Sequence, residues 1–260
     1  MTISADPKCI LINDHFQNFK RYQIPRAQLV IADIPYNVGV NAYGSSPEWY
    51  VDGDNSKGPS KLAGKEFFDT DKDFRVPEYM EFCSRLIKPE PKDELRQAGA
   101  MIVFCAYQQL PILAAEGERH GFKMSYPLYF IKKTSAQVLK ANMRICGAVE
   151  TALVLYRDRL PKFNGGGQMV LNWMPYPKDD GTPKIHPTQK PLPLLRRLIE
   201  LFTDPGDVVI DPVAGSGSTL RAAVELGRHA YGFEIKKDFY HAANDVMLRN
   251  IAPVLPLGAA

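Results

Sequence analysis

The 260-residue sequence predicts an α/β fold with a mostly parallel, doubly wound sheet. Two observations favour this class. Short apolar runs alternate with amphipathic stretches of helical period along most of the chain, as in sheets covered by helices on both faces. Several of the apolar runs end in an acidic residue, namely Asp14, Asp33 and Glu234. We expect one domain over residues 1–260, since a chain of this length buries roughly 70–75% of its unfolded surface.

Strands are expected where apolar residues run together between polar turns. In chain order these runs are residues 10–12, 29–32, 100–106, 126–131, 150–156, 208–210 and 229–233. Helices are expected where apolar side chains recur every three or four positions. These stretches are residues 15–22, 76–87, 110–120, 191–202, 218–226 and 238–250. Pro77 opens the second of them, and Asp204-Pro205-Gly206 ends the helix that precedes the strand at 208–210.

Two long segments lack such periodicity. Residues 37–75 are rich in Gly, Ser, Asp, Asn and Lys, and a polar connection of this length predicts a mobile loop or lid. Residues 157–185 contain three consecutive glycines and several prolines, which predicts a loop with little regular structure.

The charge is small overall but unevenly spread. The formal net charge is +3, yet residues 119–162 hold nine Lys or Arg and only two acidic residues. A basic middle favours a polyanion-binding face, with a solvated helix surface as the alternative. The four cysteines form no CxxC pair, so no metal site or disulfide framework is expected, and free thiols suit the cytoplasm. Neither a secretion signal nor a membrane span is expected.

The first chemical motif is Asp33-Ile34-Pro35-Tyr36, directly after an apolar strand. Asp33 can accept hydrogen bonds, Pro35 stiffens the turn and Tyr36 offers a flat face for stacking. Such a set suits holding a planar heterocycle by its edge and face together. In isolation, a turn with a packing ring is an equally good interpretation.

The second motif is a loop of small residues between a strand and a helix, from Asp211 to Thr219. Such a loop lets a ligand approach the backbone and points helix-terminal N–H groups at it. Glu234 follows Gly215 by 19 positions, about the distance at which an acidic residue holds ribose hydroxyls. The third glycine of a dinucleotide fingerprint is replaced by Leu220, which argues against an oxidoreductase.

With these motifs, the chain resembles the S-adenosylmethionine-dependent DNA amino-methyltransferases. Their D-P-P-Y motif and D-P-F-x-G-S-G-T loop are matched by residues 33–36 and 211–219, and their H-P-T-x-K-P segment by residues 186–191. The catalytic motif precedes the cofactor motif, which is similar to the permuted beta group. The resemblance implies a Rossmann-like methyltransferase fold with circularly permuted motif order, and S-adenosylmethionine as cofactor.

The family also implies roles for individual residues. The catalytic set would be Asp33, Ile34, Pro35 and Tyr36, with the amino group of a flipped base held by the Asp33 carboxylate and the carbonyl of Ile34. Lys190 would suit the cofactor's carboxylate, Glu234 its ribose and Asp14 its adenine; a helix cap is the alternative for Asp14. The cofactor set comprises Asp14, Asp33, Thr188, Lys190, Asp211, Pro212, Ala214, Gly215, Ser216, Gly217, Thr219 and Glu234.

The expected reaction is direct in-line methylation of the exocyclic N6 of adenine, without a covalent intermediate. Aspartate at position 33 favours adenine; N4 of cytosine is the alternative, as is a non-catalytic DNA-binding relative, because Ile34 replaces the family's proline and loses its fixed φ.

Double-stranded DNA is the expected partner. Its phosphates would be neutralised by Lys132, Lys133, Lys140, Arg144 and Arg157. Residues 157–185 are a candidate DNA-recognition loop. Because no separate recognition domain is visible, a short recognition sequence or help from a second subunit in a homodimer is expected.

Overall fold

The computed structural model describes residues 6–36, 74–133, 138–140, 145–186 and 188–252, with the side chains of residues 138–140 and 145–146 left out. Most of the expected lid at residues 37–75 therefore lies outside the described residues.

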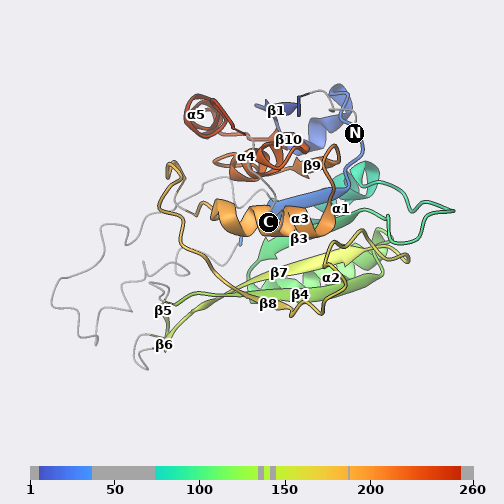
Figure 1. The fold of residues 1–260 in the computed structure, drawn as a ribbon. Helices are drawn as coiled ribbons and strands as arrows, with labels where there is room; N and C mark the ends of the chain where they lie inside the picture. The colour runs from blue at the N-terminus through green and yellow to red at the C-terminus, as the bar shows by residue number, and fades with distance from the viewer. Residues whose placement is uncertain (1–5, 37–73, 134–137, 141–144, 187, 253–260) are drawn as a thin grey trace.

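The core is an eight-stranded sheet with the order β1-β10-β9-β2-β3-β7-β4-β8 (Figure 1). Its strands are β1 (Cys9–Ile12), β2 (Leu29–Asp33), β3 (Ala100–Cys105), β4 (Met124–Ile131), β7 (Val149–Tyr156), β8 (Trp173–Pro175), β9 (Val208–Asp211) and β10 (His229–Phe233). All neighbouring pairs are parallel except those of β7, which runs antiparallel to β3 and β4. The prediction of a mostly parallel sheet is confirmed.

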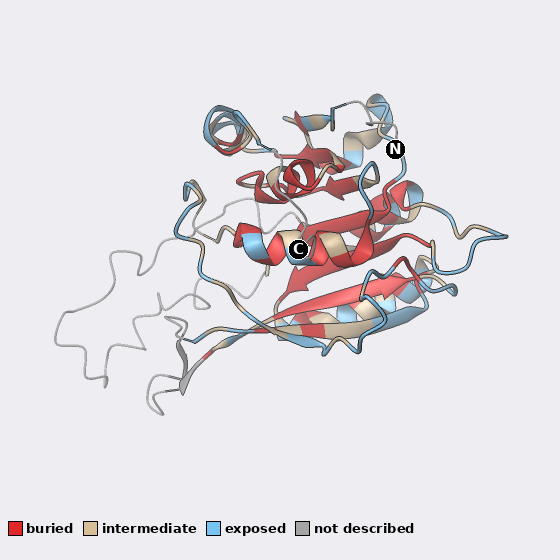
Figure 2. Cartoon of the chain, viewed as in Figure 1, coloured by how far each residue is buried: buried red, intermediate tan, exposed pale blue. Residues whose placement is uncertain are grey.

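Helices cover both faces of this sheet. Alternate residues of β2 explain why: Leu29 and Ile31 belong to the same buried cluster as α3 (Leu192–Phe202) and α4 (Ser218–Glu225). Val30 and Ala32 point to the other face, into a cluster with α1 (Val76–Leu86) and α2 (Leu110–Arg119). Figure 2 shows the buried strands between these layers. The sheet is thus doubly wound, as predicted.

The strand order reverses between β9 and β2. These neighbours pair through Leu29 and Val209, yet β9 continues through α4 to β10 on one side, while β2 continues through α1 to β3 on the other. In open α/β sheets, ligands bind outside the carboxyl ends of the strands at such a reversal. The fold therefore indicates a binding site at the carboxyl ends of β2 and β9, where Asp33 and Asp211 are the last strand residues.

Two expectations need correction. Residues 157–185 are not loop throughout, because β8 pairs with β4 through Tyr129 and Trp173 and extends the sheet. The expected terminal helix is split into α5 (Lys237–Ala242) and a π-helical turn, Ala243–Met247. The other strands and helices match their predicted ranges to within a few residues; the expected helix at 15–22 is a 3₁₀ helix, Phe16–Arg21.

A short two-stranded ribbon of β5 (Val138–Lys140) and β6 (Ile145–Cys146) extends from the end of the sheet where β4 ends and β7 begins (Figure 1). Within the described part of the chain, no helix is long and apolar enough to cross a membrane.

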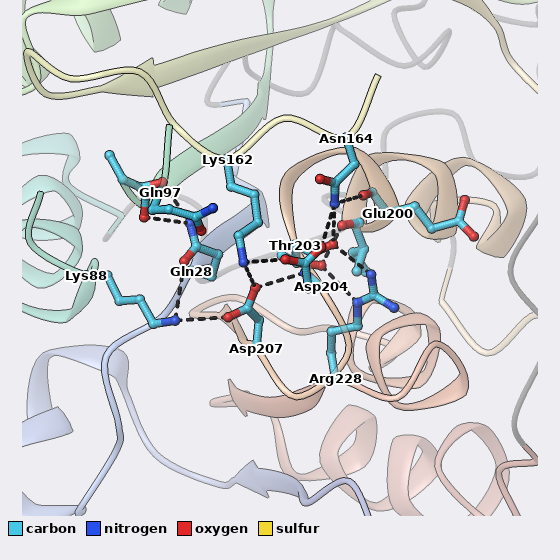
Figure 3. Close-up of polar contacts among 12 residues, drawn as sticks. Gln28, Lys88, Gln97, Lys162, Asn164, Glu200, Thr203, Asp204, Asp207 and Arg228 are labelled. Atoms are coloured by element: carbon cyan, nitrogen blue, oxygen red, sulfur yellow. Dashed lines mark hydrogen bonds and ion pairs between the residues drawn. The ribbon is translucent and has the colours of Figure 1, made fainter. Parts of the chain in front are cut away.

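At the opposite end of the strands, where the parallel strands begin, ion pairs join several segments of the chain. We call this group the anchor cluster: Lys88, Lys162, Asp204 and Asp207 (Figure 3). Lys88 Nζ lies 2.9 Å from Asp207 Oδ1, and Lys162 Nζ lies 2.8 Å from Oδ2. The N–H of Asp204 also donates to Oδ2, at 2.8 Å. The cluster joins the segments that precede β3 and β9 to the chain that follows β7.

Candidate active site

The motif at residues 33–36 lies at the carboxyl end of β2 and is held by β3 and the turn that follows it. Ile34 is 1% exposed, and its N–H donates to the carbonyl of Phe104 at 3.2 Å. A proline at this position has no N–H and could not make that bond. Ile34 thus replaces the stiffness of a proline ring with a hydrogen bond to the neighbouring strand.

Gln109 is a residue that sequence reasoning missed. Its Nε2 donates to the carbonyl of Pro35 at 2.9 Å, and its Oε1 accepts from the N–H of Ala106 at the same distance. The side chain is 8% exposed. No motif indicates this contact, since a glutamine in the first turn after a strand is common. Gln109 therefore fixes the motif loop from outside it.

Asp33 belongs to a partly buried charge group that we call the active-site cluster: Asp33, Lys132, Glu150 and Lys190. Lys190 Nζ lies 2.7 Å from Asp33 Oδ2 and 3.3 Å from Glu150 Oε2. Lys132 pairs with the other oxygen of Glu150. The Lys190 ammonium also lies 5.8 Å from the centre of the Tyr36 ring and 5.2 Å from that of Phe104. The cluster brings together β2, β7, the end of β4 and the segment before α3.

Burial and charge act against each other in this cluster. Burial raises the pKa of Asp33 above its ordinary value, although the Lys190 charge opposes the rise. Burial disfavours the Lys190 ammonium, but the Asp33, Tyr36 and Glu150 groups outweigh it and hold the pKa of Lys190 well above the usual value. Among the described residues, Asp33 Oδ1 is buried and meets no donor in ordinary hydrogen-bond geometry, although the Tyr36 hydroxyl also interacts with this carboxylate and lowers its pKa. One oxygen of the carboxylate is thus held by Lys190, while the other has only the neighbouring Tyr36 hydroxyl beside it.

The glycine loop joins β9 to α4 and presents a second carboxylate. Asp211 is 4% exposed and accepts hydrogen bonds from the N–H of Val213, at 3.0 Å, and from the Thr219 hydroxyl. Burial raises the pKa of Asp211 to about 7. Gly215 and Gly217 have φ of +50° and +75°, the left-handed region in which residues with a Cβ are strained. These two positions require glycine.

Glu234 and the glycine loop contact each other directly. The N–H of Gly215 donates to Glu234 Oε2 at 2.8 Å, and the N–H of Lys236 donates to Oε1 at 2.7 Å. Burial raises the pKa of Glu234 despite these bonds. Asn13, at the end of β1, donates to the Glu234 carbonyl at 2.8 Å. The carboxyl ends of β9, β10 and β1 therefore meet here, and Glu234 contacts the glycine loop from which it is 19 positions away.

The H-P-T-x-K-P segment covers the loop. His186 packs over Gly215, where an added Cβ would lie 3.4 Å from Nε2, and its ring centre is 4.5 Å from that of Phe239. Burial lowers the pKa of His186 to about 4, so the ring is neutral. Thr188 Oγ1 lies 3.2 Å from His186 Nδ1. The segment thus connects the loop, through His186, to the active-site cluster, through Lys190.

Asp14 lies beyond the end of β1 and is engaged locally. Its carboxylate accepts from the N–H of His15, from Asn18 Nδ2 at 2.7 Å and from the Tyr22 hydroxyl at 2.8 Å. These bonds lower its pKa. The N-cap of the following 3₁₀ helix is His15, whose side chain accepts from the N–H of Gln17. Asp14 is therefore not the cap that formed the alternative interpretation.

The basic residues of the middle segment separate in space. Lys132 and Lys133 follow β4 at the edge that carries Asp33, and Lys132 is already paired with Glu150. Arg157 lies at the far end of β7, where it donates to the Ser84 carbonyl at 2.9 Å and covers the Phe122 ring at 4.7 Å. β7 runs antiparallel to β3 and β4, so the residues before it lie near the carboxyl ends of those strands and the residues after it lie near their amino ends. The expected single basic face therefore does not include Arg157.

Two of the predicted phosphate contacts cannot be placed. The side chain of Lys140 and the whole of Arg144 lie outside the described residues. In the described part of the chain, no group of three or more His, Cys, Asp or Glu side chains is arranged to hold a metal ion.

Known proteins resemble this chain in sequence and in fold. A family model described as DNA methylase matches residues 27–245. The DNA adenine methyltransferase YhdJ of Escherichia coli (strain K12) is 25% identical over 264 residues, covering 90% of this chain and 80% of YhdJ. The M1.HpyAVI–SAM complex aligns with a TM-score of 0.65 and 21% identity, covering 91% of this chain and 97% of that one. PvuII DNA methyltransferase (cytosine-N4-specific) aligns with a TM-score of 0.66 and 18% identity, covering 92% and 86%. The matched model spans most of the sequence and includes both motifs, so the chain belongs to the DNA methylase family, the S-adenosylmethionine-dependent N6/N4 DNA methyltransferases that its motifs predicted.

Proposed function

We propose that this chain methylates the exocyclic N6 of an adenine that is flipped out of double-stranded DNA, with S-adenosylmethionine as the methyl donor. The observation that carries the proposal is Asp33 Oδ1, a buried carboxylate oxygen at the strand-order reversal of the sheet that no donor satisfies in ordinary geometry and that lies beside the ring-bearing Tyr36 of the same motif. A buried acceptor in this state costs free energy unless a ligand satisfies it. The adenine amino group is a donor of the required kind.

The residues beside this oxygen fit a nucleoside cofactor. A buried carboxylate, Glu234, faces a loop whose Gly215 and Gly217 keep side chains away from the backbone. We propose that Glu234 binds the ribose and that Thr188 and the loop from Asp211 to Ser216 surround the methionine part. When bound, S-adenosylmethionine supplies a methyl group on a positively charged sulfur.

The protein's part in the reaction is to hold the amino nitrogen. Tyr36 stacks on the base, and Asp33 Oδ1 and the Ile34 carbonyl accept its two N–H groups. So held, the nitrogen lone pair would be free to accept the methyl group that bound S-adenosylmethionine supplies, and the electrons of the broken carbon–sulfur bond would stay on the cofactor's sulfur. Asp33, which accepts one N–H of the amino group, would take the proton that the methylated nitrogen gives up. Positioning and electrostatics account for the acceleration.

The described thiols agree with this route. Burial raises the pKa of Cys105 and of Cys83 to about 12 and that of Cys9 to about 11, so none of the three is a thiolate at neutral pH. A methyltransferase that attacks a ring carbon through cysteine would need such a thiolate.

Aspartate at position 33 favours adenine as the target. The second candidate is N4 of cytosine, because the same acceptors can hold either amino group. DNA phosphates would contact Lys133 and the β5–β6 ribbon, which extends from the same end of the sheet. The affinity for DNA would then fall as the salt concentration rises. The proposed location of this activity is the cytoplasm.

The test is incubation with methyl-labelled S-adenosylmethionine and duplex DNA of mixed sequence, followed by analysis of the nucleosides. N6-methyladenine is the expected product. N4-methylcytosine would establish the second candidate, and DNA binding without transfer would establish a non-catalytic relative. An Asp33→Ala variant with full activity would overturn the proposed chemistry.

A further inference from the structure

We propose that Lys190 is a positioning residue for Asp33: its ammonium, braced by Glu150, holds the Oδ2 oxygen and leaves Oδ1 facing the target amino group. The proposal rests on the function given above and deepens it. It also gives Lys190 a different partner from the cofactor carboxylate that the motif resemblance implies.

The geometry of three separate elements carries this assignment. Asp33 comes from β2, Glu150 from β7 and Lys190 from the segment before α3. The ammonium lies 2.7 Å from Asp33 Oδ2 and 3.3 Å from Glu150 Oε2, and the residue is 6% exposed. A lysine whose role was to bind the cofactor carboxylate would not need two carboxylates of the protein as partners. Here Asp33 and Glu150 hold the Lys190 ammonium at the carboxyl end of β2.

The charges of the cluster explain why a cation is required. A buried carboxylate without a cation becomes protonated, because burial disfavours the charged form. A protonated Asp33 would present a donor where the mechanism needs an acceptor. Lys190 opposes this by attracting the ionised form, and Lys132 neutralises the additional charge of Glu150. The two carboxylates and the two ammonium groups of the cluster thus carry equal and opposite charge around Asp33 Oδ1.

Several other titratable or charged groups face the three residues. These groups are Tyr36, Cys105, Lys132, Tyr176, His186 and Asp211. Burial raises the pKa of Cys105 and of Tyr176, which keeps both neutral, and burial keeps His186 neutral. Asp211 alone has a pKa of about 7 and adds a neighbouring titration that the experiment must separate.

Two substitutions with opposite expected signs test the assignment. Lys190→Met removes the attraction that lowers the pKa of Asp33, so this pKa rises. Glu150→Gln removes a like charge and leaves the Lys190 contact in place, so the pKa of Asp33 falls. The direct measurement is the carboxyl ¹³C shift of labelled aspartate as a function of pH in cofactor-free protein, with Asp33→Asn to assign the signal. The acid limb of kcat against pH should move in the same directions, by about tenfold in activity at fixed pH for each unit.

Controls separate the outcomes. Lys20→Met, which removes an exposed lysine of the 3₁₀ helix, should leave the Asp33 titration unchanged. Glu150→Gln is nearly isosteric and keeps the test valid if Lys190→Met does not fold. An unchanged Asp33 titration in both variants would overturn the proposal. So would an unchanged titration with S-adenosylmethionine affinity reduced tenfold or more in Lys190→Met, since Lys190 would then serve the cofactor. Neither titration depends on turnover, so absence of methyl transfer by the wild type would count against the proposed function alone.

Discussion

The two ends of the strands each carry a partly buried cluster of four charged residues, and the central carboxylates of the clusters differ in how many partners they have. In the anchor cluster both oxygens of Asp207 are occupied, by Lys88 on one side and by Lys162 and the Asp204 N–H on the other. In the active-site cluster Asp33 has Lys190 on Oδ2, while Oδ1 has no donor in ordinary geometry and only the Tyr36 hydroxyl beside the carboxylate.

The pKa values follow this difference. Burial would raise the pKa of Asp207, but the Asp204 N–H and the two lysines outweigh it and lower the pKa. For Asp33, the partner is not enough to offset burial, and the pKa is raised. A carboxylate with all its partners stabilises the fold, whereas one that lacks a partner keeps binding capacity for a ligand at some cost in stability. The comparison predicts which substitutions change activity and which change stability.

Asp33→Asn should give the largest effect. The amide places a donor group where the amino nitrogen needs an acceptor, so kcat should fall by about 10²–10⁴-fold, the range for loss of a positioned acid–base group. Unfolding stability should change little, because Lys190 keeps Glu150 as a partner. The measurements are single-turnover methylation and denaturant unfolding. Loss of stability with retained kcat would reverse the roles given to the two clusters.

Asp207→Asn should have the opposite profile. It leaves Lys88 and Lys162 without their shared carboxylate, at a cost of about 2–3 kcal/mol, less than for a fully buried pair because Lys88 is 38% exposed and Lys162 keeps Asp204. Because the folded pKa is lowered, the contribution of Asp207 is present above its unfolded pKa and is lost as the pH falls. The stability difference between wild type and variant should therefore shrink in acid. kcat below the melting temperature should be unaffected.

The sequence predicted the sheet class, the helices and both motifs because each depends on local pattern: apolar period, strand-end acids and glycine spacing. It missed β8, since Trp173–Pro175 is only three residues long, ends in a proline and forms a strand only because β4 lies beside it. The Lys190–Glu150–Asp33 contacts join residues 40 to 157 positions apart and depend on which strands become neighbours. The position of Arg157 could not be predicted either, because it requires knowing that β7 runs antiparallel across the sheet.

Asp211→Asn sharpens the comparison through pH. Among the described residues, no cation is paired with Asp211, and burial raises its folded pKa to about 7, above the usual 3.8. A raised carboxyl pKa means that stability is greatest below the unfolded pKa and falls as the pH rises towards the folded one. At pH 8, where Asp211 is ionised in both states, its burial lowers the free energy of unfolding by at most about 4 kcal/mol. In cofactor-free protein, the variant should therefore gain stability relative to wild type between pH 4 and pH 8. A stability difference between variant and wild type that does not change with pH would mean that Asp211 is ionised over this whole pH range.

The smallest effect is expected for Gln109→Leu, with Gln28→Leu as its matched control. Both glutamines are buried and donate to a carbonyl, Gln109 to Pro35 at the active edge and Gln28 to Ala98 at 2.7 Å near the anchor cluster. Each substitution removes a buried side-chain hydrogen bond and should cost about 1–3 kcal/mol in unfolding free energy, although the Ala98 carbonyl keeps the N–H of Lys162 as a donor. Only Gln109→Leu should also lower kcat, by about tenfold, because it alone frees the loop that carries Asp33 and Tyr36. Equal kcat values for the two variants would show that the hydrogen bond from Ile34 to β3 is sufficient to hold that loop.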